Sequence, residues 1–497
     1  MKKIRLLTLL LCISMVIPTL IACQDNRKNP TPSGGGTTEV IDNIPADFNL
    51  NGEAVGILYP GHIEEQIEGD NETLDIVYTK IYERNQKVAV RLNVDLQLIH
   101  SGTTWWEDFV PVLRKYVQTL DDSFEIVMTT NNTVIQNKLF SLFHNLNDSL
   151  YIDIEQEWWY KDAIMELSVD NYYYRFLYGD ILLGGLGNAG CIYYNKDLYG
   201  QYVDPGNPDG LYDYVFNGTW TFERFASEVK KSHIDMGGEN DIHGYSLFRY
   251  GEPLHYFPVS CDVEFYTRDN NGLPVITVYN QKAVEFTQKL YDLLYNNEGA
   301  WLFFPNQIGA ETAHARDFVD GKVMFSLGTI ISFLNEDMRQ MEDNFGVLPY
   351  PKWDEQQEEY ITMMANGSTL VAIPVSVTED RALNESSAVI EAMCSEAYQS
   401  IAPAFYETAC KRAYSRDDTS AEILDIITGR HPTIKSKLTK NFLYEYSSSI
   451  GGAGTIFQSI MSKGATGNPN LTSTWESMET AANAQLKELI TQYLQGI

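Results

Sequence analysis

Aromatic, amide and carboxylate side chains are the groups in this 497-residue sequence whose types and positions point to ligand chemistry. Aromatic residues make up 12% of the chain, with 31 Tyr and 8 Trp. A ring can stack on an apolar C–H face, whereas amides and carboxylates form hydrogen bonds with hydroxyl groups. Tyr59 lies at the end of the apolar run Glu53–Gly61, and Thr130 and Asn131 follow the run Phe124–Thr129. Each is a candidate ligand contact; inward packing of the tyrosine and a turn-forming asparagine are the alternatives.

Motifs that would indicate catalysis, a cofactor or a metal are missing or lack their context. The sequence GLGNAG at Gly185–Gly190 fits the dinucleotide pattern GxGxxG, but a strand-like run follows where a helix must start. We therefore expect these glycines to allow close backbone packing and bending at a hinge. DPGNPDG at Asp204–Gly210 does not match the EF-hand calcium loop, the eight histidines form no HExxH pair, and GxSxG is absent. We predict that the protein is not an enzyme and has no cofactor and no metal site.

The N-terminus has the features of a targeting signal. After a positively charged start, the apolar run Leu6–Ala22 is short of the roughly 20 residues that a membrane-spanning helix needs. Leu20–Cys23 resembles the bacterial lipobox, in which the cysteine is diacylated and becomes the new N-terminus; a plain signal peptide is the alternative. We expect residues 1–22 to be a lipoprotein signal peptide, Cys23 to be the lipid attachment site, and residues 23–47 to be a flexible linker in which Pro, Gly, Ser, Thr and Asn together dominate.

The mature chain is strongly acidic. Removing residues 1–22 removes three of the 36 basic residues and leaves 33 against 67 acidic ones, a formal charge of −34. This charge disfavours a nucleic-acid partner, which needs a basic surface; it is typical of a solvated acidic surface and could suit a cationic ligand. Four cysteines follow the lipobox without CxxC spacing. The sequence is compatible with a disulfide between Cys394 and Cys410 and equally with buried free thiols.

The candidate contacts need elements that hold them, and the first part of the body predicts a βαβ series. Strands are predicted over residues 53–61, 94–99 and 124–129. Helices are predicted between them, over residues 73–93 and in TWWEDFVPVLRKYVQTL, with Thr104 as the cap. Strand, helix and strand at this spacing indicate a parallel sheet with covered faces.

The later part of the sequence has equally local signals. The run CIYY, residues 191–194, is strand-like, and Thr221 is predicted to cap the helix of TWTFERFASEVKKS. Asn271-Gly272 between two extended runs predicts a hairpin, and residues 367–377 predict another buried strand. The remaining residues are mostly helical in pattern.

Five segments, in this order, resemble the extracellular solute-binding proteins of bacterial ABC importers, the maltose-binding-type family: IYYNKDLY, TWTFERF, FVDGKVMFSLG, NFGVLPYP and IPVSV. A narrower similarity, carried by IYERNQKVAVRLNV and by Pro403–Ile427, is to large lipoproteins of that family. The resemblance implies an α/β, two-lobed periplasmic-binding-protein-like (type II) fold with hinge-crossing segments. Residues 48–187 and 366–435 would form lobe one, and residues 188–365 and 436–497 would form lobe two, with the ligand between the lobes.

The resemblance also implies site residues. Asn188 and Asn366 match the two crossovers between the lobes, and Gly328 and Thr329 follow the strand-forming segment VMFSL. Members of the family often have a stacking aromatic residue two positions after that glycine. Here the residue is Ile330, so the sequence departs from the family at this sugar platform.

Further candidates come from the segment FRYGEPLHYFP and from the tryptophans. Tyr250, Glu252 and Tyr256 lie where maltose-type proteins offer aromatic and acidic groups. Additional stacking candidates are Trp105, Trp106 and Trp301. Trp158 and Trp159 are expected to pack beside the helix that carries them.

These features predict a monomeric, lipid-anchored receptor on the outer face of the cytoplasmic membrane. It would capture a small solute, most simply an oligosaccharide, and deliver it to an ABC transporter permease. The alternatives are a surface glycan-degrading enzyme, a binding protein that feeds a sensor kinase, and peptides or polyamines as the ligand. A glycosidase would need two carboxylates about 5–10 Å apart across one cleft.

Overall fold

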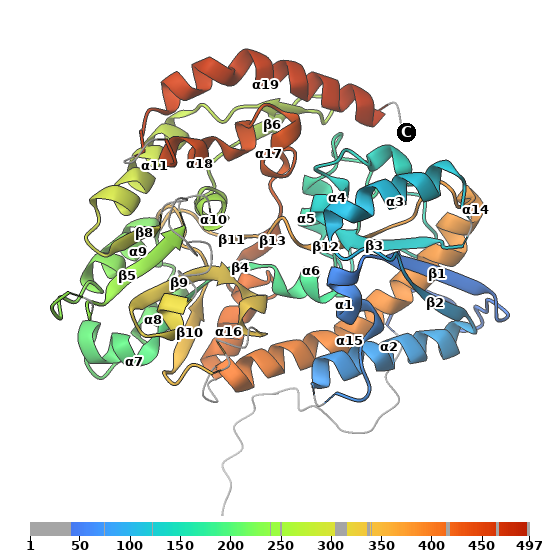
Figure 1. Ribbon diagram of the computed structural model, residues 1–497, viewed down its shortest axis with the longest axis horizontal. Helices are drawn as coiled ribbons and strands as arrows, with labels where there is room; N and C mark the ends of the chain where they lie inside the picture. Colours follow the sequence, from blue (N-terminus) through green and yellow to red (C-terminus); the bar gives the residue numbers. More distant parts are fainter. Residues whose placement is uncertain are drawn as a thin grey trace, which may run out of the picture. The chain divides into compact units, whose positions relative to one another are not determined.

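Two separate sheets organise the folded part of the chain (Figure 1). The computed structural model describes residues 41–497 apart from residues 74, 122, 239, 249–250, 304–315, 335–337, 339, 414–417, 464–466 and 495–497. Asp42–Ile497 form one compact unit. The predicted signal peptide, the lipid attachment site Cys23 and the linker as far as residue 40 lie outside the described residues.

The first sheet has the strand order β12-β3-β1-β2. β1 (Ala54–Tyr59) pairs in parallel with β2 (Asp95–His100) and β3 (Ile126–Thr130), whereas β12 (Thr369–Ala372) pairs antiparallel with β3. All of β3 and nearly all of β1 is buried, as in central strands with both faces covered. The predicted parallel series is confirmed, and the strand predicted over residues 367–377 extends the same sheet.

Helix α2 (Ile76–Leu92) connects β1 to β2 and has well-defined ends. The side chain of Asp75 accepts a hydrogen bond from the N–H of Val77 at 3.0 Å, which caps the first turn. At the other end Asn93 adopts a left-handed conformation with φ 47°. The prediction of a helix over residues 73–93 is confirmed with the start shifted by one turn.

Helix α3 (Trp106–Gln118) connects β2 to β3, and its predicted cap is wrong. The N-cap position is Trp105, whose side chain makes no capping bond. Thr104 stays outside the helix because its carbonyl accepts a hydrogen bond from the backbone N–H of His62 at 2.9 Å. A contact with a distant segment therefore overrides the local capping signal.

The second sheet has the order β10-β4-β9-β5-β8. Its strands are β4 (Gly190–Asn195), β5 (His243–Phe248), β8 (Ala300–Phe303), β9 (Val323–Thr329) and β10 (Phe345–Leu348). The strand-like run CIYY therefore lies in β4. Helices α9 (Phe222–Lys231), α10 (Pro253–Ser260) and α11 (Gln281–Tyr291) belong to this half. The predicted cap of α9 is confirmed, since Thr221 Oγ1 accepts from the N–H of Arg224 at 3.2 Å.

The chain crosses between the two sheets at neighbouring points. The single helical turn α6 (Leu183–Gly187) leads into β4, and Ala189 forms an isolated bridge with Met364. Beside this crossing, β11 (Tyr360–Met363) pairs in parallel with β13 (Ser436–Thr439). Segments far apart in sequence thus meet at the junction of the halves.

Helix α15 (Ser387–Ala413) lies beside α2, as Figure 1 shows. The indole N–H groups of Trp158 and Trp159 each donate to the carboxylate of Glu391 on this helix, at 2.9 Å. Both tryptophans are buried, but the prediction that they lie on a helix is wrong, because they precede α5 (Lys161–Glu166). Their hydrogen bonds to Glu391, more than 200 positions away, could not be predicted from the local pattern.

The C-terminal part is largely helical and ends in α19 (Leu471–Leu494), which runs across the top of Figure 1. The predicted hairpin is confirmed as β6 (Tyr266–Arg268) and β7 (Pro274–Ile276), with Gly272 at φ 78° in the turn. The shorter helices, including 3-10 and π turns marked η, are η1 (Gly61–Ile63), α1 (Glu64–Glu68), α4 (Asn131–Val134), η2 (Phe140–Leu142), α7 (Lys196–Leu198), η3 (Tyr199–Val203), α8 (Gly210–Phe216), η4 (Asp292–Asn296), η5 (Ile330–Leu334), α14 (Glu379–Arg381), η6 (Ala382–Ser386), α16 (Asp418–Ile427), α17 (Phe442–Glu445), η7 (Ser447–Ser449), η8 (Ala453–Thr455) and α18 (Ile456–Met461).

The structure shows the state of three cysteines and where the folded body begins. Cys191, Cys261 and Cys394 are free and buried, so no bridge joins Cys394 to Cys410. Asp42 accepts two hydrogen bonds of 2.6 Å from Arg91, which attaches the chain to α2 before the expected end of the linker. Within the described residues, no helix combines the length and apolarity that crossing a membrane requires.

Candidate ligand-binding site

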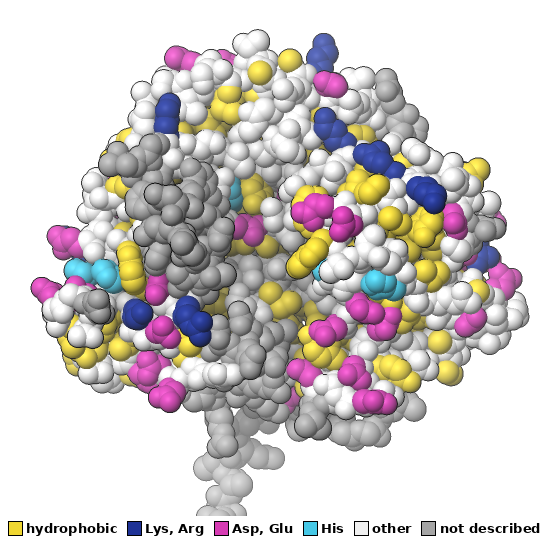
Figure 2. Space-filling model, in the orientation of Figure 1, with side chains coloured by type: hydrophobic (Ala, Val, Ile, Leu, Met, Phe, Trp, Pro, Cys, Tyr) yellow, Lys and Arg dark blue, Asp and Glu magenta, His cyan; other side chains and the backbone are white. Residues whose placement is uncertain are grey.

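A cavity of about 450 Å³ is lined by residues from both halves of the molecule. Figure 2 shows the corresponding face hollowed near its centre, with apolar and acidic side chains at the rim. Gln136 follows α4 beside the first sheet, whereas Glu252 at the N-cap of α10 and His255 within α10 lie beside the second. Asn366 comes from the crossing segment. The C-terminal part contributes the other lining residues: Tyr444, Glu445, Ser447, Ser448, Gly452, Thr455 and Gln458.

Glu252 precedes the first residue of α10 and is held by neutral donors. Its Oε1 accepts hydrogen bonds from the backbone N–H of Asn366 at 2.7 Å and from the hydroxyl of Tyr444 at 3.4 Å. Burial raises the pKa of this carboxyl, opposed by these donors, by the hydroxyl of Tyr256 and by the charge of Lys440. The carboxylate thereby connects the crossing segment with both α10 and α17.

A buried ion pair lies behind the cavity. Lys440 Nζ contacts Glu445 Oε1 at 2.9 Å and donates to the carbonyl of Ala365 at 2.6 Å, and neither charged side chain is exposed. The amide of Asn131 donates to the second oxygen of Glu445 and accepts from the hydroxyl of Tyr178. Burial raises the pKa of Glu445 and the neighbouring ammonium opposes the shift. Both oxygens of Glu445 are therefore engaged within the protein.

Two rings form an aromatic side of the cavity. The imidazole of His255 and the ring of Tyr444 lie with centroids 4.2 Å apart and planes at 33°. Burial lowers the pKa of His255 to about 3, against the opposing hydrogen bond with Gln458. The imidazole is therefore uncharged at neutral pH.

Four of the predicted site residues come together here. Glu252 and Asn366 line the cavity and bond to each other, Asn131 holds the carboxylate behind it, and Tyr256 packs beside Glu252. Tyr250 lies outside the described residues. One of the two predicted crossover residues, Asn366, thus lines this cavity.

The predicted contacts Tyr59, Trp105 and Trp301 lie elsewhere. Tyr59 is fully buried and donates its hydroxyl to Glu68, so the inward-packing alternative is correct. Trp105 is 59% exposed and stacks on His62 at 5.9 Å. Trp301 packs on an imidazole of β5 at 4.7 Å. Each ring satisfies a local contact and none lines the cavity.

Four other predicted residues are structural in their contacts. The hydroxyl of Thr130 is 3.3 Å from that of Thr133, and the amide of Asn188 donates to the carbonyl of Gly184 at 2.9 Å. Gly328 and Thr329 pair with β4 at the end of β9. None of the four lines the cavity. Backbone pairing and local hydrogen bonds engage them within the protein instead.

The prediction missed the segment KNFLYEYSSSIGG, residues 440–452, which supplies the aromatic ring, the ion pair and two serines. Its density of Tyr, Glu and Ser directly after a strand was a usable signal. The contact of this segment with the first sheet could not be predicted from local sequence, because Asn131 and Glu445 are 314 positions apart.

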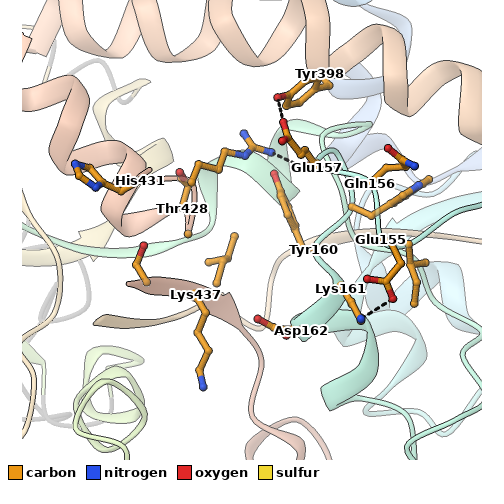
Figure 3. A pocket seen from close by; sticks show the side chains of 16 residues that line it. Glu155, Gln156, Glu157, Tyr160, Lys161, Asp162, Tyr398, Thr428, His431 and Lys437 are labelled. Carbon is orange, nitrogen blue, oxygen red and sulfur yellow. Dashed lines mark hydrogen bonds and ion pairs between the residues drawn. The ribbon is translucent and has the colours of Figure 1, made fainter. Parts of the chain in front are cut away.

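A second cavity, of about 500 Å³, opens elsewhere (Figure 3). Figure 3 shows that Tyr398 and Lys161 are each bonded to a glutamate of the wall, Glu157 and Glu155 respectively. Its lining falls within residues 154–162, 398, 428–431 and 436–438, so the second sheet contributes nothing to it. It therefore lacks the two-sided construction of the first cavity.

Arg430 in its wall is an ion-pair partner. Its Nη2 donates to the fully buried Asp180 at 2.6 Å, and its guanidinium lies over the ring of Tyr160 at 5.7 Å. The hydroxyl of Tyr160 donates to the same carboxylate oxygen at 2.6 Å. Across the described part of the chain, no group of three or more His, Cys, Asp or Glu residues could hold a metal ion.

Comparison with known proteins identifies the fold. No family model matches the sequence, and no curated protein matches it. A cyclic α-maltosyl-1,6-maltose binding protein from Arthrobacter globiformis matches with a TM-score of 0.54 and 14% identity, covering 88% of this chain and 99% of the other. RafE from Streptococcus pneumoniae matches at 0.51 and 14% identity, covering 88% and 98%. An ABC transporter solute-binding protein from Agrobacterium radiobacter K84, in complex with ribitol, matches at 0.50 and 12%, covering 89% and 99%. The chain therefore has the two-lobed α/β fold of ABC solute-binding proteins.

Proposed function

We propose that the protein is a solute receptor that binds an oligosaccharide between its lobes and delivers it to an ABC transporter permease. The observation that carries the proposal is the cavity that Gln136, Glu252 and Asn366 line from both halves of the fold. Its amides, hydroxyls and carboxylate can exchange hydrogen bonds with sugar hydroxyls, and the Tyr444 ring offers an apolar face. A volume of about 450 Å³ is within the usual range for small-molecule sites.

Ligand contacts with both halves would explain transport. A solute that contacts both lobes binds the closed arrangement more tightly than an open one and shifts the equilibrium toward it. The permease then recognises the closed form. Two of the matched proteins are named for, or seen with, a carbohydrate or polyol, which supports this class of ligand.

Calorimetry with a panel of oligosaccharides tests the proposal. Binding should weaken at least tenfold in Tyr444→Ala, because the variant loses the ring face and one donor to Glu252. The matched control is Tyr172→Ala, which removes an exposed tyrosine that does not line the cavity. The absence of binding across glycans, peptides and polyamines would contradict a receptor role.

The glycan-degrading alternative is weaker on the geometry. The cavity does contain two carboxylates, Glu252 and Glu445, which is the number a glycosidase needs. However, both oxygens of Glu445 are bonded, to Lys440 and Asn131, and the side chain is fully buried. It has no free oxygen for a sugar ring or a water molecule. New reducing ends after incubation with oligosaccharides would restore the enzyme reading.

We also propose that a lipid on Cys23 anchors the receptor to the outer face of the cytoplasmic membrane, and that the receptor acts as a monomer. The lipobox-like Leu20–Cys23 supports the anchor. In a bacterial host, Cys23→Ala should abolish incorporation of labelled palmitate and release the protein from the membrane fraction. Retention of both properties in the variant would contradict the anchor.

A further inference from the structure

The charges around the cavity do not balance. Among the described lining residues the ionisable groups are Glu252, His255, Tyr444 and Glu445, and none is Lys or Arg. His255 is neutral because burial lowers its pKa to about 3. The charge of Glu445 is offset by Lys440 at 2.9 Å. Among the described residues Glu252 has no ion pair of its own: the ammonium of Lys440 acts on it, but Lys440 is bonded to Glu445.

The donors to Glu252 are all uncharged. The backbone N–H of Asn366 and the hydroxyls of Tyr444 and Tyr256 stabilise the carboxylate but bring no positive charge. A partly buried carboxylate whose nearest described cation is already paired with another carboxylate is costly, since desolvation disfavours the charged form. A cation supplied by the ligand would remove this cost, whereas an anionic ligand would increase it.

The side chains beside Glu252 also suit a cation. The ring face of Tyr444, next to the neutral imidazole of His255, can attract an ammonium group. The rest of the lining, which includes Gln136, Ser447 and Thr455, is polar and uncharged. Such groups match hydroxyls and not a second charge.

We propose that the bound solute carries a primary ammonium group, placed between the Glu252 carboxylate and the Tyr444 ring, on an otherwise hydroxyl-rich body such as an amino sugar. This inference rests on the proposed function and narrows its ligand class. The site then discriminates by charge: a free amine binds, its acetylated form binds less well, and a uronic acid is rejected.

Calorimetry with four probes tests the inference on the wild-type chain: glucosamine trimer, N-acetylglucosamine trimer, galacturonic acid trimer and spermidine. We expect the free amine to bind at least tenfold more tightly than its acetylated counterpart, and the uronic acid not to bind. Equal affinity for the first two would overturn the inference and leave the proposed receptor function intact. Binding of spermidine alone would support the ammonium site and contradict the oligosaccharide part of the proposed function. No binding by any probe would overturn the inference, whereas binding of other neutral glycans would still uphold the receptor.

A variant locates the effect. Glu252→Gln keeps the shape of the side chain and an oxygen that can accept from Asn366, but removes the charge. The ratio of amine to acetylated affinity should fall to about one. Glu107→Gln, which removes an exposed carboxylate on α3 that does not line the cavity, should keep the wild-type ratio. A ratio unchanged in Glu252→Gln would overturn the assignment. The four-probe comparison does not depend on the variant, so the inference stays testable if the variant fails to fold.

Discussion

Burial acts on Glu252 and His255, one helical turn apart on α10, in a way that favours the neutral form of each. It raises the pKa of the carboxyl and lowers that of the imidazole. The two groups nevertheless differ in their surroundings. Glu252 has three donors and the charge of Lys440 to stabilise its ionised form, whereas only the hydrogen bond with Gln458 opposes the effect of burial on His255. The carboxylate can therefore carry charge at the cavity, while the imidazole contributes a ring.

The low pKa of His255 predicts a specific loss of stability in acid. Between about pH 3 and pH 6.5 the unfolded state binds a proton on this residue that the folded state does not, so the free energy of unfolding falls as the pH falls. From pH 7 to pH 5 the wild type should lose about 2 kcal/mol more than His255→Gln in urea unfolding. His100→Gln, at an exposed histidine, is the control and should behave as the wild type. The same loss in His255→Gln and wild type would mean that the imidazole is not held neutral.

At the scale of elements, α6 shows why a glycine-rich motif need not bind a phosphate. A Cβ on Gly185 would lie 2.4 Å from the carbonyl oxygen of Gly179, and one on Gly187 would lie 2.7 Å from Ile331. The glycines let this turn approach its neighbours where the chain crosses between the sheets. The prediction of close packing at GLGNAG is thus confirmed by contacts that leave no room for a side chain.

Gly185→Ala should therefore destabilise the protein. The clash is with backbone, which cannot rotate away, and overpacking of this kind typically costs about 1–3 kcal/mol in the free energy of unfolding. Gly367→Ala provides a matched control at the other crossing, because nothing lies within 4 Å of the added Cβ, and it should change stability by less than about 0.5 kcal/mol. Urea unfolding of both variants measures the difference. If Gly185→Ala were as stable as the wild type, the turn would have room that the structure does not show.

The elements were more predictable from sequence than the site. Strands, the hairpin at Gly272 and the cap at Thr221 depend on neighbouring residues, so local patterns found them. The start of α3 was missed because Thr104 bonds to a distant segment. The site residues Tyr444 and Glu445 were missed for the same reason, since they reach the cavity only through contacts between distant parts of the chain.

On the scale of the whole molecule, the C-terminal part connects the two halves. Helix α19 begins against the second half, where Thr472 Oγ1 is 3.1 Å from the hydroxyl of Tyr279. Near its other end Tyr493 packs on Phe140 at 5.3 Å and donates to the carbonyl of Tyr173 at 2.9 Å, both in the first half. The top of Figure 1 shows the helix extended over both halves. A helix fixed at both ends resists separation of the lobes.

The hairpin β6–β7 makes a second connection through Arg268. Its guanidinium donates to the carbonyls of Ser168 at 2.8 Å and Val169 at 3.1 Å, beyond α5 in the first half. Within the hairpin it also donates to the carbonyl of Gly272 at 2.8 Å. Opening the lobes at this side would remove the acceptors Ser168 and Val169 from a partly buried cation, which is unfavourable. Any separation of the two halves must therefore keep these bonds or break them at a cost.

Removing the arginine should loosen the two halves relative to each other. With spin labels at Lys115→Cys on α3 and Lys230→Cys on α9, in a background with Cys23 and Cys410 replaced by Ser, the wild type should give one narrow distance distribution by electron–electron double resonance. Arg268→Ala should broaden it, because the hairpin no longer holds the segment after α5. Arg224→Ala is the matched control, since Arg224 packs on Tyr214 and pairs with Glu228, both inside the second half. A distribution that is equally narrow in Arg268→Ala would show that α19 alone fixes the lobes, and one that is already broad in the wild type would show that neither connection does.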